Sequence, residues 1–246
     1  MSDLLAFQEA LWTTAKSAAS QSRFNQALCH LKPLLHDSSN RRLNLLAHRL
    51  AGRIYVNLEK FSHARKMFRA AIKLMPLCDQ TWFDLGQAFE FDPYGCDRRA
   101  AKCYRKASRL KPTEAKYYAA FGLALVRLNR LKMAFTQLRE AKRLAGQDAN
   151  TLKLIVTAYL EANRPEMADE VLKPLRFSTD RSIQKLLKSV QHALTAVGQR
   201  RPNPKLPNRV VPFLQVVSDA PVVNREGGII RHDFGNKPAP HFLKRG

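Results

Sequence analysis

The strongest constraint on this sequence is that it repeats itself. Copies of one residue pattern begin at residues 45, 79, 115 and 149, and a degraded first copy begins near residue 8. The period is therefore 34 residues, with two more residues in the copy from Asp79, around Asp92–Gly95. A period of 20–50 residues predicts stacked supersecondary units rather than one closed globule.

Each unit is expected to be a pair of helices, because apolar residues recur in each half at i, i+3, i+4 and i+7. Gly52, Gly86 and Gly122 occupy one register inside these patterns, where glycine costs about 1 kcal/mol relative to alanine. This repeated cost predicts a close approach of the two helices. The small residues expected opposite are Ala64, Ala100 and Ala134. The large side chains expected to fill the space between successive pairs are Phe68, Tyr104 and Leu138.

The order of residue types resembles the tetratricopeptide repeat. In the copy from Asp79 it reads Trp82, Leu85, Gly86 and Phe89, then Ala100, Tyr104, Ala107 and Pro112. The resemblance covers roughly residues 8–182. It implies an all-α fold, a right-handed TPR-type α-solenoid of antiparallel helix pairs.

The predicted organisation is one TPR-like helical repeat domain, residues 1–198, followed by a tail. The units are expected at about 8–41, 45–78, 79–114, 115–148 and 149–182, with a C-terminal capping helix at 181–197. Pro76 and Pro112 are expected to end second helices. The expected N-caps are Asp79, Thr113 and Asp148. Residues 199–246 form a basic Pro-rich tail, expected to be disordered or docked in extended form.

Composition narrows the function. The chain has 42 Lys and Arg against 20 Asp and Glu, and this charge of +22 favours acidic or polyanionic partners. No apolar run reaches the ~18 residues that a membrane span needs, and the N-terminus lacks a signal-peptide pattern, so a cytoplasmic protein is expected. The four cysteines form no CxxC pair, and no phosphate-binding glycine motif occurs. We therefore expect no enzyme, cofactor, metal or small-molecule ligand.

The family resemblance implies that the first helices line a concave groove. Residues whose register points inward are Lys16, Arg49, Arg53, Asn57, Gln87, Lys116, Arg127 and Lys153. Some members of the family clamp a peptide's terminal carboxylate with basic groups and an asparagine, but Asp84 stands at the asparagine position here. The sequence thus predicts a non-enzymatic adaptor or scaffold that binds an acidic or extended peptide or protein partner in this groove.

The second helices carry dense runs of basic residues, which the resemblance places on the convex surface. They are Arg65, Lys66, Arg69, Arg98, Arg99, Lys102, Arg105, Lys106, Arg109, Arg139, Lys142 and Arg143. Either this is a solvated face, or the chain is an RNA-, ribosome- or DNA-associated basic helical repeat protein. Base-specific recognition is not expected, because the aromatic residues are committed to packing. A further alternative is a co-chaperone-like adaptor that its own tail inhibits by docking into the groove.

Overall fold

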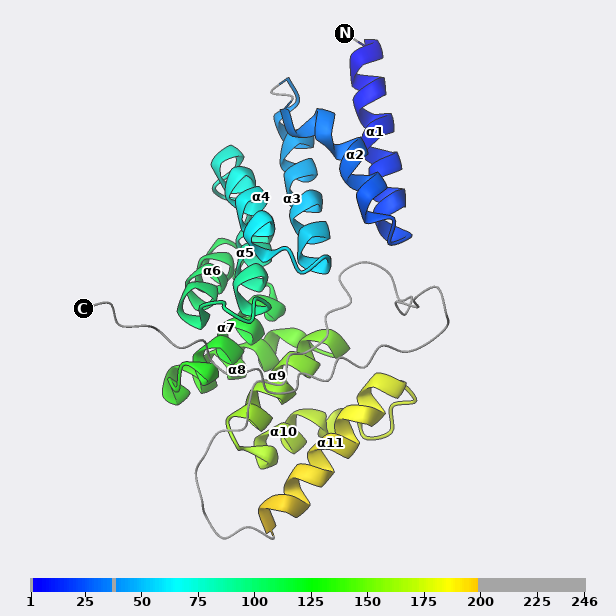
Figure 1. Ribbon diagram of the computed structural model, residues 1–246. Coiled ribbons are helices and arrows are strands. Elements are labelled where there is room, and N and C mark those ends of the chain that lie inside the picture. Colours follow the sequence, from blue (N-terminus) through cyan, green and yellow to red (C-terminus); the bar gives the residue numbers. More distant parts are fainter. Residues whose placement is uncertain (1, 37–38, 199–246) are drawn as a thin grey trace, which may run out of the picture.

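The computed structural model describes residues 2–36 and 39–198, which fold into helices joined by short turns (Figure 1). The helices are α1 (Ser2–Ser20), α2 (Phe24–His36), α3 (Arg41–Asn57), α4 (Phe61–Leu74), α5 (Asp79–Glu90), α6 (Asp97–Leu110), α7 (Ala115–Arg127), α8 (Leu131–Ala145), α9 (Ala149–Glu161), α10 (Pro165–Leu172), the 3₁₀ turn η1 (Lys173–Leu175) and α11 (Arg181–Gly198). No strand occurs in these two ranges. The predicted all-α solenoid is confirmed, and the tail at 199–246 lies outside the described residues.

Successive helices pack as pairs, and the pairs stack along the chain. The pairs are α1 with α2, α3 with α4, α5 with α6, α7 with α8, and α9 with α10. Two clusters of buried apolar side chains run through the stack, one shared by α1, α2 and α3, the other extending from α4 to α11. Ile183, Leu187 and Val190 of α11 are buried in the second cluster. The helix therefore packs against the last pair, α9 and α10.

The close approach predicted at the glycines is present, but the opposing residue differs from the expectation. A Cβ added at Gly52 would lie 2.5 Å from Cε1 of Phe68, and one at Gly86 would lie 2.5 Å from Cε1 of Tyr104. At Gly122 the nearest atom belongs to Leu138, at 2.6 Å. The large side chain of each second helix thus rests on the glycine of its own unit, because only glycine leaves room for it.

The predicted helix ends are partly correct. Helices α4 and α6 end two residues before Pro76 and Pro112. Asp148 caps α9, since its carboxylate accepts hydrogen bonds from the backbone N–H groups of Asn150 and Thr151 at 3.2 and 3.3 Å.

The two other N-cap predictions were wrong. Cys78 is the N-cap of α5 and Glu114 is the N-cap of α7, in each case without a side-chain capping bond. Asp79 is the first residue of α5, and its carboxylate accepts a hydrogen bond from the Tyr117 hydroxyl at 2.6 Å. The residue therefore links α5 to α7 instead of capping a helix.

The turn inside a unit has one recurring geometry. A residue other than glycine has a φ between 55° and 58° at Ser22, Glu59, Asn129 and Asn163. Around Glu59 the backbone N–H of Lys60 bonds the carbonyl of Tyr55 at 2.8 Å, and that of Glu59 bonds the carbonyl of Val56 at 3.0 Å. These two bonds form the Schellman motif, which satisfies carbonyls at the end of a helix.

The third unit replaces this turn by its two additional residues. The carboxylate of Asp92 accepts a hydrogen bond from the backbone N–H of Tyr94 at 3.0 Å, and the carbonyl of Asp92 accepts one from Gly95 at 2.7 Å. A Cβ at Gly95 would collide with the carbonyl oxygen of Phe89. Glycine is therefore required for this longer turn to fold back onto α5.

We expect Gly52→Ala to lower the free energy of unfolding by about 1–3 kcal/mol, because overpacking outweighs the ~1 kcal/mol helix preference of alanine. Urea unfolding measures this cost. In a Phe68→Ala background the same substitution should cost less, since the opposing ring is gone. An equal cost in both backgrounds would contradict the assigned contact.

We expect Glu59→Gly to raise the free energy of unfolding by about 0.5–1 kcal/mol, because an L-residue pays about 1–2 kcal/mol in the left-handed region and glycine regains part of this. Glu59→Ala is the matched control, since alanine removes the same side chain but keeps the Cβ atom that the left-handed region penalises. Thermal unfolding of the three proteins checks the order. A Glu59→Gly variant no more stable than the parent would count against strain at this turn.

Candidate functional site

A hollow of about 580 Å³ opens on the first helices of the N-terminal units. Its lining comprises Trp12, Thr13, Lys16, Ser17, Ala19, Ser20, Leu46, Arg49, Leu50, Arg53 and Gln80. These residues belong to α1, α3 and the first turn of α5. The hollow unites three of the cations expected in the groove, Lys16, Arg49 and Arg53, with apolar side chains.

Arg49 is held in place by contacts within the chain. Its Nε and Nη2 atoms donate to Oδ2 of Asp84 at 3.0 and 2.8 Å, and its Nη1 donates to Oε1 of Gln80 at 2.8 Å. The side chain of Arg49 is 14% exposed. Because Nε, Nη1 and Nη2 of Arg49 already donate hydrogen bonds within the chain, this side chain is better suited to line the hollow than to bind a partner.

Asp84 is the shared counter-charge of this region. Burial raises the pKa of its carboxyl, and the nearby cations of Arg49, Arg53 and Lys116 oppose that rise. Three basic residues, Arg49 and Arg53 of α3 and Lys116 of α7, thus lie near the Asp84 carboxylate. The sequence had placed Lys116 near Arg49 and Arg53, but had not recognised Asp84 as their common partner.

Lys116 also contacts aromatic rings. Its Nζ atom lies 5.9 Å from the ring centroid of Phe83 and 5.5 Å from that of Tyr117. The same atom is 3.4 Å from Oε1 of Glu114. These contacts restrain the lysine, since cations are attracted to aromatic faces.

Arg127 is the centre of a buried ionic cluster. Its Nη1 donates to Oε1 of Glu90 at 2.7 Å, while Nε and Nη2 donate to the two carboxylate oxygens of Glu161 at 2.9 and 3.0 Å. Glu90 also accepts a hydrogen bond from the Tyr104 hydroxyl. Burial raises the pKa of Glu90, with Arg127 opposing the rise. Arg127, expected to face a partner, instead joins α5, α7 and α9.

The remaining groove candidates do not enter the hollow. Asn57 and Gln87 are half-buried, and Lys153 of α9 is exposed. The sequence register points Trp12 inward together with Lys16, which lies four residues later on α1, and both line the hollow. That spacing places two side chains on the same helix face and was the available signal for this wall.

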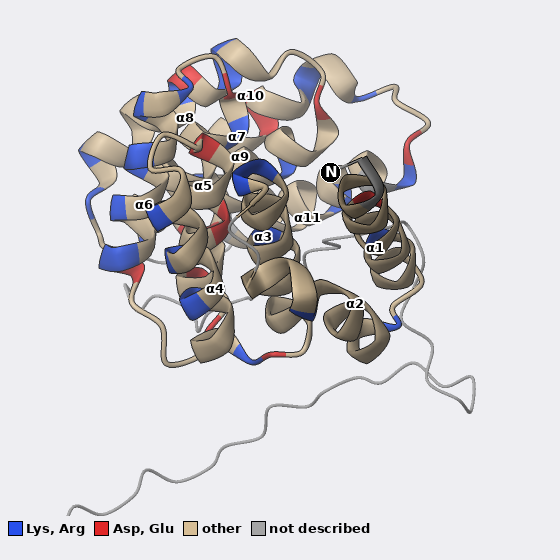
Figure 2. Cartoon of the chain, turned by 90° about the horizontal axis from the view of Figure 1, so that it is seen from above, with Lys and Arg blue, Asp and Glu red and all other residues tan. Residues whose placement is uncertain are grey.

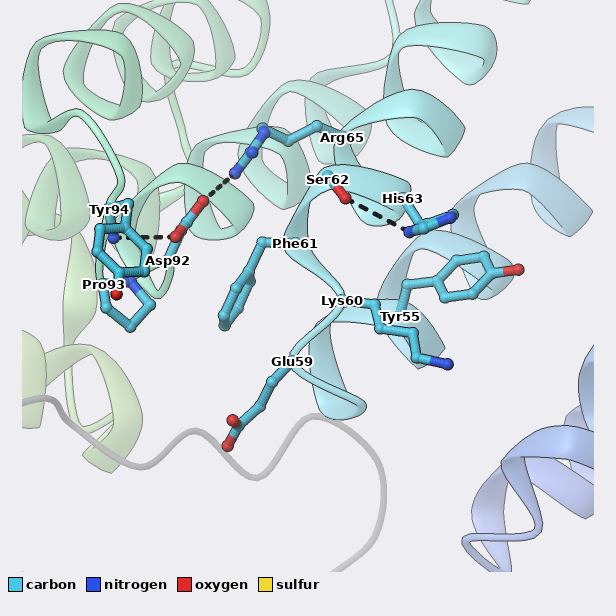
Figure 3. A pocket seen from close by; sticks show the side chains of 10 residues that line it. All are labelled: Tyr55, Glu59, Lys60, Phe61, Ser62, His63, Arg65, Asp92, Pro93 and Tyr94. Atoms are coloured by element: carbon cyan, nitrogen blue, oxygen red, sulfur yellow. Dashed lines mark hydrogen bonds and ion pairs between the residues drawn. The ribbon is translucent and has the colours of Figure 1, made fainter. Parts of the chain in front are cut away.

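A second hollow, of about 640 Å³, lies at the rim between the turns of the second and third units (Figure 3). Its lining comprises Tyr55, Glu59, Lys60, Phe61, Ser62, His63, Arg65, Asp92, Pro93 and Tyr94. Arg65 donates to Oδ2 of Asp92 at 2.5 Å, as the dashed line in Figure 3 shows. Arg65 is therefore half-buried and ion-paired, unlike the exposed outer cation that the sequence predicted.

The other eleven basic residues predicted on the outer face are all exposed, and they lie on α4, α6 and α8. On α8 the guanidinium of Arg143 pairs with Glu140 at 2.6 Å. Within residues 2–36 and 39–198 no cluster of three His, Cys, Asp or Glu side chains is arranged to hold a metal ion. In the same two ranges no helix has the length and apolar character that crossing a bilayer requires.

The family model of the tetratricopeptide repeat matches residues 48–76, which span most of α3 and α4. Residues 48–76 therefore match one tetratricopeptide repeat. The chain is 26% identical over 147 residues to the tetratricopeptide repeat-containing protein trd-1 of Caenorhabditis elegans. The match covers 53% of this chain and 19% of that protein, so the chain spans about a fifth of the curated relative's length.

Solved structures share the architecture of this chain. YrrB, described as a TPR protein with an unusual peptide-binding site, has a TM-score of 0.54 at 20% identity, covering 75% of this chain and 88% of YrrB. The MamA protein has a TM-score of 0.54 at 15% identity, covering 80% of this chain and 98% of MamA. At these identities the likeness shows a common fold.

We expect Arg127→Met to lower the free energy of unfolding by about 3–5 kcal/mol, because it leaves two carboxylates of a buried cluster without their cation. Lys153→Met is the matched control on α9 and should change stability by less than about 0.5 kcal/mol, as an exposed side chain does. Urea unfolding of both variants checks the difference. Similar small effects would show that Arg127 is not structural.

Proposed function

We propose that this chain is a non-enzymatic scaffold that binds an acidic, extended segment of a partner protein in the hollow formed by α1, α3 and α5. Tetratricopeptide repeat proteins act as protein-interaction scaffolds, which supports the class of function. The observation that carries the proposal is the lining of the hollow, where Trp12 and Leu46 adjoin Lys16 and Arg53. Apolar surface beside cations suits a segment with both apolar and acidic residues.

The apolar and the basic residues that line the hollow would contact different parts of the partner. Trp12 and Leu50 are also packed on the N-terminal core cluster, so they offer a fixed apolar surface. Lys16 is exposed on α1, where its ammonium can meet a carboxylate of the partner. An extended segment turns alternate side chains to opposite sides, so its apolar and acidic residues can reach different walls.

The charge of the groove changes along its length. Near α1 and α3, Lys16, Arg49 and Arg53 outnumber the carboxylate of Asp84. Near α7 and α9, Arg127 faces both Glu90 and Glu161. Lys153 of α9 is exposed at that end, but two carboxylates there share one guanidinium, so an acidic segment is favoured more strongly at the N-terminal end. This asymmetry would fix the direction in which the segment lies.

Peptide selection tests the proposal. Short random peptides displayed on phage, selected on the full chain, should be enriched in Asp and Glu. A selected peptide should then bind about 10-fold or more weakly to a Lys16→Glu, Arg53→Glu double variant, which corresponds to a loss of at least ~1.4 kcal/mol. Fluorescence anisotropy measures the dissociation constant, and higher salt should weaken binding because Lys16 is exposed and Arg53 is partly exposed to solvent.

The matched control is a Lys132→Glu, Lys185→Glu double variant, which changes the net charge equally on exposed positions of α8 and α11. It should retain the parent affinity apart from a small general charge effect. Equal losses in both double variants, or selected peptides without acidic residues, would refute the hollow as the binding site.

A further inference from the structure

The outer side of the second and third units carries the densest charge among the described residues. Its cations are Lys66, Arg69 and Lys73 of α4, and Arg98, Arg99, Lys102, Arg105, Lys106 and Arg109 of α6. All nine are exposed, and we call this set the α4–α6 ridge. Figure 2 shows Lys and Arg recurring along α6 at the outer rim of the solenoid.

The cations of α6 share one side of the helix. Each residue advances about 100° around the axis, so the six residues from Arg98 to Arg109 fall within an arc of about 120°. Ala100, Tyr104 and Ala107 on the opposite side are buried. The apolar side of the helix is thus used for packing, and the charged side is left to solvent.

The two helices of the α4–α6 ridge form a continuous surface. Both pack against α5. The guanidinium carbon of Arg65 on α4 and that of Arg99 on α6 lie 5.3 and 5.8 Å from the ring centroid of Phe89. Burial raises the pKa of the Cys103 thiol on α6 to about 12, and the positive charge of Arg69 on α4 opposes this rise. Arg69 therefore lies close to α6. Charges on the two helices therefore lie close enough for one ligand to meet both.

The charge of the ridge is not compensated by neighbouring residues. Helix α4 contains no acidic residue, and α6 contains Asp97 alone. Within residues 2–36 and 39–198, none of the nine ridge cations takes part in an ion pair, whereas Arg65 pairs with Asp92 and Arg143 with Glu140. Soluble proteins usually intersperse positive and negative charges on their surface. A surface of positive charge alone therefore indicates a role beyond solubility.

We propose that the α4–α6 ridge binds double-stranded nucleic acid through its phosphates, without regard to base or sugar. The 14 residues of α6 extend about 21 Å, and a duplex presents one negative charge per ~1.7 Å of its axis. Five of the nine cations are arginines, whose planar fork suits phosphate oxygens. This surface lies on second helices, so it is separate from the hollow proposed for a peptide.

The structure disfavours the other polyanionic partners. Single strands are held by stacking their bases on aromatic side chains, but Phe68 and Tyr104 of these two helices are fully buried. The more exposed Phe61 and Tyr94 line the second hollow beside Asp92. Amphipathic helices bind membranes through their apolar face, and that face of α4 and α6 is packed in the core. Phosphate contacts along a duplex require neither feature.

Fluorescence anisotropy tests the proposal with the full chain and fluorescein-labelled duplexes of one sequence, as DNA and as RNA. Both duplexes should bind with similar affinity at 50 mM salt. With about six phosphate contacts, the association constant should fall about 10³-fold between 50 and 200 mM salt. A duplex of unrelated sequence should give the same result.

A Lys102→Gln, Arg105→Gln, Lys106→Gln triple variant should weaken binding and reduce the slope of log K against log salt by about three. A Lys132→Gln, Lys185→Gln, Lys188→Gln triple variant is the control, because it removes the same charge from exposed positions of α8 and α11. Its slope should equal that of the parent. Far-UV circular dichroism verifies that both variants remain helical.

Several results would overturn the proposal. One is the absence of duplex binding at 50 mM salt, and another is an equal loss of slope in both triple variants. A third is strong preference for a single strand, or for one sequence. Binding to phosphatidylserine vesicles with no binding to either duplex would assign the α4–α6 ridge to a membrane surface instead.

Discussion

The contact between a glycine on the first helix of a unit and a large side chain on the second sets the spacing of the three central units. At Gly52, Gly86 and Gly122 there is no room for a Cβ atom. Because each such unit is closed in the same way, the units can stack with a constant offset, and residues at one register recur at one place on the solenoid. The ion pairs between neighbouring units and the α4–α6 ridge both depend on this regularity.

The charges of the two sides are used differently. Along the first helices, Arg49 and Arg127 form ion pairs with carboxylates of neighbouring units, and these pairs stabilise the stack. Along α4 and α6, most cations have no such counter-charge among the described residues. The uncompensated part of the net charge of +22 is therefore uneven. Ion pairs neutralise cations on the first helices, whereas the cations of the α4–α6 ridge have no ion-pair partner among the described residues.

Features that depend on spacing within a unit could be predicted from the sequence. The helix pairs, the close approach at the glycines and the helix ends before Pro76 and Pro112 follow from local patterns. The partners of Arg49 and Arg127 could not, because Asp84 and Glu161 lie 35 and 34 residues away and meet them only through the offset between units. The capping role expected of Asp79 failed for a similar reason, since Tyr117 from the next unit takes its carboxylate.

The longer turn at Asp92–Gly95 shows where such a solenoid accepts change. It lies at the rim, closes through its own backbone bonds, and leaves Gly86 and Tyr104 in the contact seen in the other units. Extra residues there lengthen the edge without altering the pitch of the stack. A rim of this kind can diversify from unit to unit like the loops of an antibody, while the scaffold beneath it stays unchanged.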